Sequence, residues 1–209
     1  MKMPSVWIRT VLLASLLAAV AANPVAQAVD DVTPELRYKL FIQKLDTKQF
    51  TLDYAKAVRN LDSDDSETQV TGLMTLSATD ELAAIPFIVP LLDSKDRYVR
   101  VYAGLALNKL VSKHALKRRD DSQPMKIVIK PLGPHDTDLR PLAWVISKML
   151  RNSDDGSVHS YAATMIGYLD LKEFEPQLRQ LLKSRHPANQ NAARHALEVM
   201  GIESADPIR

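Results

Sequence analysis

The chain has 209 residues, of which 27 are basic and 25 acidic, and it contains no cysteine. The lack of cysteine excludes disulfide bonds, a lipid-modified N-terminal cysteine and thiolate metal sites. If the protein is exported, packing alone must therefore stabilise it.

Residues 1–28 have the pattern of a cleavable signal peptide. Lys2 and Arg9 form a positive segment ahead of an uncharged apolar run of 12 residues, 11–22. That run is too short to span a bilayer, which requires about 20 residues. Small side chains near Ala28 suit a signal peptidase, so we expect cleavage after Ala28 and a periplasmic or secreted protein. The alternative is an uncleaved membrane anchor.

The predicted mature chain has 181 residues, which is enough for one core or one repeat array. It carries 25 basic and 25 acidic residues, because the leader removes two positive charges. A neutral chain has no overall field to attract a polyanion, so we do not expect nucleic acid as a partner.

Residues 33–45 predict a helix within the N-terminal segment 29–50. Thr33 is placed to cap the helix, and Pro34 suits its first position. The leucines expected to point inward are Leu36, Leu40 and Leu45. We expect this helix to cover the open end of the array that follows.

A polar turn with a central serine recurs through the rest of the chain. LDSDD at 61–65 returns as LDSKD 31 positions later, and related turns follow after steps of 59 and 31 residues. The recurring serines are Ser63, Ser94, Ser153 and Ser184. Ala103, Ala162 and Ala193 fall in one column of the same alignment. This agreement indicates that one structural unit is repeated.

Each unit is expected to be a pair of helices. The first helix places apolar residues at helical spacing, as at Ile85, Ile88 and Leu92. The last aspartate of the turn is placed to cap the second helix, as at Asp65, Asp96 and Asp155. The second helix is expected to bury one stripe, Val99, Ala103, Leu107 and Leu110, with Gly104 allowing close helix contact. One pair cannot bury its apolar faces alone, so the pairs must stack.

Four units follow from this register, with a tail of no periodicity after them. The units are 51–77, 82–112, 139–169 and 172–201, which form two blocks, 51–112 and 139–201, followed by the tail 202–209. The step of 59 between the second and third units leaves an insertion, 113–138.

The segment DRYVRVYAGLALNKL (96–110), following IPFIVPLLDSK, resembles a short HEAT repeat, similar to those of phycobilin lyases and many bacterial adaptors. The matching features are Pro86, Pro176, the aspartate before the second helix, Val99–Arg100 and the Ala103–Leu107 spacing. The resemblance covers about 51–201. It implies an all-α fold, an α-α superhelix of about four helix pairs with an N-terminal capping helix. It also implies that a protein ligand would lie on a concave face of second helices.

Side chains of the second helices that could contact a protein partner are Arg97, Tyr98, Arg100, His159, Tyr161 and Gln190. For Tyr161, the alternative is a place in the core. Arg100 is replaced by Gln69, His159 and Gln190 in the other units. A continuous ladder of Asp and Arg is therefore not expected.

The centre of the chain, around the insertion, is basic, since residues 95–135 carry 10 basic and 3 acidic residues. The candidate contact residues of the insertion are Lys113, Lys117, Arg118 and Arg119. They could meet an acidic protein surface, make weak contact with anionic lipid, or simply face solvent. Residues 125–133 are strand-like, and could form a hairpin, offer an edge to a partner strand, or pack on the helices.

No motif predicts catalysis. The five histidines lack the spacing of metal ligands, no nucleophile has an evident base, and the aspartate pairs lie in polar turns. We therefore expect no metal, no cofactor and no enzymatic activity. The leading hypothesis is an exported scaffold or adaptor that binds another protein. The alternatives are a small-ligand-binding or lyase-like protein, or an accessory protein at a membrane surface; the oligomeric state stays open.

Overall fold

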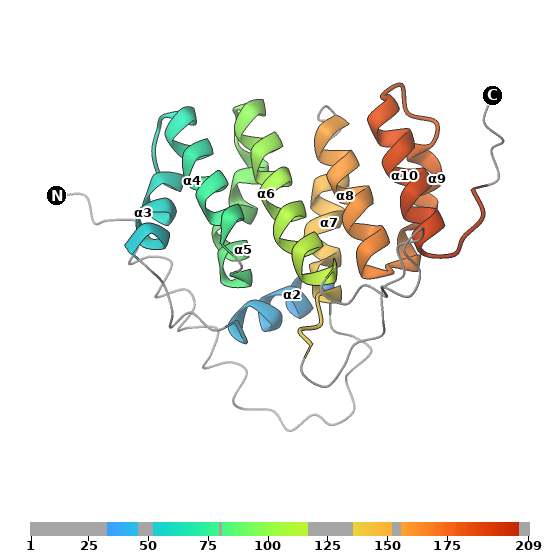
Figure 1. Ribbon diagram of the computed structural model, residues 1–209, viewed down its shortest axis with the longest axis horizontal. Coiled ribbons are helices and arrows are strands. Elements are labelled where there is room, and N and C mark those ends of the chain that lie inside the picture. Colours follow the sequence, from blue (N-terminus) through green and yellow to red (C-terminus); the bar gives the residue numbers. More distant parts are fainter. Residues whose placement is uncertain (1–32, 46–51, 80, 117–135, 152–155, 205–209) are drawn as a thin grey trace. The chain divides into compact units, whose positions relative to one another are not determined.

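The structure is a computed structural model that describes residues 33–45, 52–79, 81–116, 136–151 and 156–204. Pro34–Arg209 form one compact unit. All regular secondary structure of the described residues is helical (Figure 1), which confirms the all-α prediction. The predicted leader and the strand-like stretch 125–133 lie outside the described residues.

Short 3-10 segments, labelled η, alternate with α-helices along the chain. In order, they are α2 (Pro34–Gln43), α3 (Leu52–Leu61), α4 (Ser66–Ala78), η1 (Leu82–Ala84), α5 (Ile85–Ile88), η2 (Val89–Asp93), α6 (Arg97–Leu116), η3 (Arg140–Leu142), α7 (Ala143–Arg151), α8 (Gly156–Leu169), η4 (Lys172–Phe174), α9 (Glu175–Leu181) and α10 (Pro187–Val199). Since α6 runs to Leu116, the first residues of the predicted insertion are helical.

The helices pack in pairs along the chain. α3 contacts α4, η2 contacts α6, α7 contacts α8, and α9 contacts α10. The second helices also contact one another in chain order, α4 with α6, α6 with α8, and α8 with α10 (Figure 1). An ion pair between Lys148 of α7 and Asp93 of η2 links the neighbouring first helices.

The core lies between these helices and has the predicted register. The stripe of α6, namely Val99, Ala103, Leu107 and Leu110, is completely buried. Ile166 and Leu197, which align with Leu107, are completely buried as well. The register taken from the repeating turns therefore places equivalent apolar residues in equivalent environments.

The recurring serine closes the turn between the two helices of a unit. Its Oγ accepts a hydrogen bond from the backbone N–H two residues later, at 3.1 Å in Ser63 and 3.2 Å in Ser94 and Ser184. The aspartate caps follow as predicted, because Asp65 accepts from the backbone N–H of Thr68 at 2.8 Å and Asp96 from that of Tyr98 at 2.7 Å. Ser153 and Asp155 lie outside the described residues.

The predicted N-terminal helix exists, but its buried face differs from the prediction. Leu36 and Leu40 are each 37% exposed, whereas Tyr38 and Phe41 are each 6% exposed. Leu45 lies beyond the helix and is only partly buried. The helix turns its two aromatic rings inward because each ring removes more apolar area from water than a leucine does.

The position of α2 also differs from the prediction. Its main contacts are with α7 and η3, and the ring of Tyr38 stacks on Trp144 with centroids 4.9 Å apart. The expectation that this helix covers the open end of the array, beside α3, was therefore wrong. Trp144 is a half-buried ring on α7, and stacking covers one face of each of the two rings.

Candidate functional site

Three tyrosines gather on the second helices α6 and α8, and we call them the tyrosine cluster: Tyr98, Tyr102 and Tyr161. Tyr98 and Tyr102 lie one turn apart on α6, which puts them on one face. Their ring centroids are 4.6 Å apart at an interplanar angle of 60°, and the Tyr98 hydroxyl donates to that of Tyr102 at 3.2 Å. Tyr98 remains 53% exposed despite these contacts.

Tyr161 joins the cluster from α8. It is half-buried, and its ring lies against Gly104, where an added Cβ would be 3.3 Å from Cδ2 of Tyr161. The ring thus packs on α6 while part of it stays accessible, and its contact with a partner stays a prediction. Burial raises the pKa of the Tyr161 hydroxyl, and the nearby Tyr102 adds to the effect.

Tyr98 and Tyr161 stay uncharged at neutral pH. The hydrogen bond to Tyr102 raises the pKa of Tyr98, and the carboxylate of Glu67 on α4 contributes in the same direction. A phenol already titrates near pH 10 in water, so a further rise keeps the proton in place. The exposed face therefore presents aromatic rings with hydroxyl groups, near the carboxylate of Glu67.

Arg100 and Gln190 hold the turn that precedes their own helix. Arg100 Nη1 donates to the backbone carbonyls of Ser94 at 2.9 Å and Lys95 at 3.1 Å. Gln190 Nε2 donates to the carbonyl of Ser184 at 2.7 Å. Two predicted partner-binding residues therefore have a structural role.

The same column holds Gln69 in the first unit and His159 in the third. Gln69 Nε2 donates to the carbonyl of Leu61 at 3.2 Å, so it also supports its turn. His159 is partly buried, and its Nε2 has no hydrogen-bond partner among the described residues. Sequence reasoning did not recognise this column as structural, although every member carries a side-chain N–H donor.

The remaining predicted contact residues do not converge. Arg97 and Lys113 are both exposed on α6. They are separated by 16 residues, or about 24 Å along the helix axis. Lys117, Arg118 and Arg119 lie outside the described residues. Arg97 adjoins the tyrosine cluster in sequence, whereas Lys113 lies near the far end of the helix.

In the part of the chain that the structure describes, no group of three or more His, Asp or Glu side chains could hold a metal ion. Among the same residues, no helix is both long enough and apolar enough to cross a bilayer.

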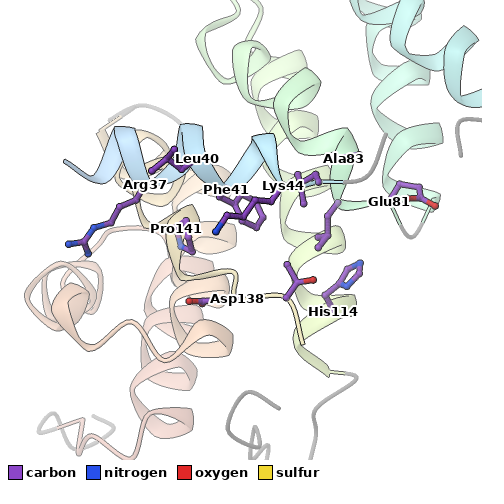
Figure 2. A pocket seen from close by; sticks show the side chains of 12 residues that line it. Arg37, Leu40, Phe41, Lys44, Glu81, Ala83, His114, Asp138 and Pro141 are labelled. Carbon is purple, nitrogen blue, oxygen red and sulfur yellow. The ribbon is translucent and has the colours of Figure 1, made fainter. Parts of the chain in front are cut away.

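A second feature, which the sequence did not predict, is a pocket of about 720 Å³ beside α2 (Figure 2). Its lining residues are Arg37, Leu40, Phe41, Lys44, Leu45, Glu81, Leu82, Ala83, His114, Thr137, Asp138 and Pro141. They come from α2 and the residues after it, from the start of η1, from the end of α6 and from 137–141. No local motif indicates a site that is assembled from segments so far apart in the sequence.

Comparison with known proteins leaves the family open. No protein-family model matches the chain, and a search of curated proteins found no match.

Proposed function

We propose that this chain is an exported scaffold or adaptor, built as an α-solenoid of HEAT-like repeats, that binds another protein through its second helices. Two observations support the repeat architecture. Each second helix packs against the second helices next to it in chain order, as expected for stacked repeats. The serine turn has the same hydrogen bond in three units.

The tyrosine cluster is the observation that carries the binding proposal. Tyrosine is enriched among residues that contribute most to protein–protein affinity, because it offers a large, stiff ring and a polar tip. Tyr98 is 53% exposed, and its ring packs against that of Tyr102. A partner that covers it would lose little additional side-chain entropy.

The structure also narrows the set of proposed contact residues. Tyr98, Tyr102 and Arg97 form the proposed centre, with Tyr161 beside them. Arg100 and Gln190 are left out because Arg100 Nη1 and Gln190 Nε2 already donate to backbone carbonyls. The basic residues Lys113, Lys117, Arg118 and Arg119 form a second proposed contact, for an acidic region of the same partner.

Site-specific photo-crosslinking tests the first contact. A benzophenone amino acid replaces Tyr98 in the whole chain, and the control protein carries it at Gln177, an exposed position on α9. We expect irradiation in the native compartment to give a discrete protein adduct at position 98 and none at position 177. Equal adducts at both positions, or none at either, would refute binding through the second helices.

A deletion variant tests the basic contact separately. Residues 117–135 are replaced by a Gly/Ser linker, which leaves α6 intact up to Leu116. We expect the adduct at position 98 to persist in smaller yield, because the charge that contributes to the encounter is removed. An unchanged yield would remove the insertion from the proposed interface.

A further inference from the structure

The pocket beside α2 combines an apolar lining with positive charge. Half of its twelve lining residues are apolar, and Phe41, Leu82 and Ala83 are among the most buried of them at 6%, 7% and 3% exposure. Leu40 of α2 is 37% exposed at the same site. A volume of about 720 Å³ is within the range of roughly 300–1,000 Å³ typical of small-molecule sites.

The positive charge comes from α2 and the residues directly after it. Arg37 and Lys44 are seven residues apart, so they lie on the face that also carries Leu40 and Phe41. Neither side chain forms an ion pair with another described residue. Figure 2 shows the amine of Lys44 directed toward Pro141, whereas the guanidinium of Arg37 points away from the centre of the pocket.

The acidic lining residues offset this charge only in part. Arg140 neutralises Asp138 through a forked contact, with Nη2 donating to Oδ2 at 2.8 Å and Nε to Oδ1 at 3.0 Å. Glu81 lies at the opposite end of the pocket from Arg37 (Figure 2). The ammonium group of Lys44 therefore lies next to an apolar wall, without a paired carboxylate among the described residues.

We propose that this pocket binds a small amphipathic anion, a carboxylate with an unbranched alkyl chain. The alkyl chain lies against Leu40, Phe41 and Leu82, and the carboxylate is held by Lys44. Burial of the alkyl chain supplies most of the affinity, since each methylene removed from water is favourable. The ammonium group selects the negative end. The tyrosine cluster is not part of this pocket, so the two proposals fail independently.

Calorimetric titration of the whole chain with dodecanoate, below its micelle concentration, tests the proposal. Dodecyltrimethylammonium has the same chain length with the opposite charge, and acetate has the carboxylate without the chain. We expect saturable binding of one dodecanoate, binding of the cation at least tenfold weaker, and no detectable binding of acetate. Equal affinity for the anion and the cation would overturn the proposal.

Two variants locate the site. Lys44→Met keeps the length of the side chain and removes its charge, and we expect it to weaken dodecanoate binding at least tenfold. Lys56→Met is the matched control on α3, exposed and outside the pocket lining. We expect it to leave the affinity for dodecanoate unchanged. Leu40→Asn makes the apolar wall polar at an exposed position and should weaken binding as well. Wild-type affinity in Lys44→Met would refute the site, with helical content by circular dichroism confirming that each variant is folded.

Discussion

At the scale of single residues, Asn189 is a polar side chain in an apolar position. It is 1% exposed, and the residues that align with it in the second and third units, Val99 and Val158, are completely buried. Its Nδ2 donates to Ser184 Oγ at 3.2 Å, but its Oδ1 has no partner among the described residues. A buried acceptor without a hydrogen bond lowers stability.

Asn189→Val should therefore raise the free energy of unfolding, by about 1 kcal/mol. The bond to Ser184 is lost, yet that hydroxyl still accepts from the backbone N–H of His186. Urea denaturation measures the change. Val158→Asn is the reverse control and should lower stability by about 1–3 kcal/mol. Loss of stability in Asn189→Val would mean that the Ser184 bond outweighs the unpaired oxygen.

Asp96 connects two units through its carboxylate. It accepts a hydrogen bond from the hydroxyl of Ser66 on α4 and another from the backbone N–H of Tyr98 on α6. These bonds favour the charged form and hold the pKa of Asp96 below its usual range, with the Ser66 bond as the largest cause. The contact is therefore sensitive to acid.

The folded-state pKa of Asp96 lies below the unfolded value of about 3.9. Its contribution to stability is therefore complete above that pH and is lost as the pH falls through the lower folded-state value. Ser66→Ala should raise the pKa of Asp96 toward the ordinary value and make the melting temperature fall less steeply below about pH 4. Carbon NMR titration of the carboxyl group measures the shift. Thr71→Ala is the control: it removes a hydroxyl bonded to the Glu67 carbonyl and should leave the pKa of Asp96 unchanged. If the pKa of Asp96 did not shift in Ser66→Ala, the Ser66 bond would not be the main cause of the lowered pKa.

At the scale of helices, α8 and α10 approach each other at a glycine. A Cβ added at Gly167 would lie 2.8 Å from Cα of Ala196 and 3.1 Å from its Cβ. Those neighbours are the main chain and first side-chain atom of α10, so they can move only if the two helices separate. The spacing of this helix pair thus depends on the absence of a side chain at position 167.

Gly167→Ala should lower the free energy of unfolding by about 1–3 kcal/mol, although alanine is the better helix former by about 1 kcal/mol. Gly104→Ala is the matched control on α6, because its nearest obstacle is Cδ2 of Tyr161 at 3.3 Å, a ring that can turn aside. We expect Gly104→Ala to change the free energy of unfolding very little. Thermal unfolding compares the two proteins, and equal losses would show that the backbone contact is not decisive.

At the scale of the whole described chain, the second helices are not equally supported. α6 and α8 each lie between two other second helices, whereas α4 and α10 each have such a neighbour on one side only. Helices with fewer packing partners open at lower free energy. Stability should therefore decrease from α6 and α8 toward α4 and α10.

Native-state hydrogen exchange should reveal this gradient. Backbone amides in α6 and α8 should exchange slowest, and those in α4 and α10 faster, since end units of a stack can open without the others. Peptide-level mass spectrometry resolves the four helices. Uniform protection from α4 to α10 would instead indicate that the chain opens as one cooperative unit.

The helix pairs and their register could be predicted from sequence because local chemistry defines them. The serine oxygen accepts a hydrogen bond from the backbone N–H two residues later. The aspartate carboxylate accepts from a backbone N–H two or three residues later. The same alignment did not reveal that Arg100 and Gln190 support their own turns. The sequence shows that both side chains carry N–H donors. The groups that accept from them are backbone carbonyls, and their direction depends on how the turn folds.

Only the tertiary structure decided the face and the position of α2, and with them the pocket. The sequence predicts a helix at 33–45, but its leucines and its aromatic residues offer two possible inward faces. The choice depends on Trp144, more than 100 residues further along the chain. Burial of apolar area is not directional, so a helix turns toward whichever partner the rest of the fold presents. The sequence by itself therefore determined the helix pairs, and long-range packing decided where the remaining helix lies.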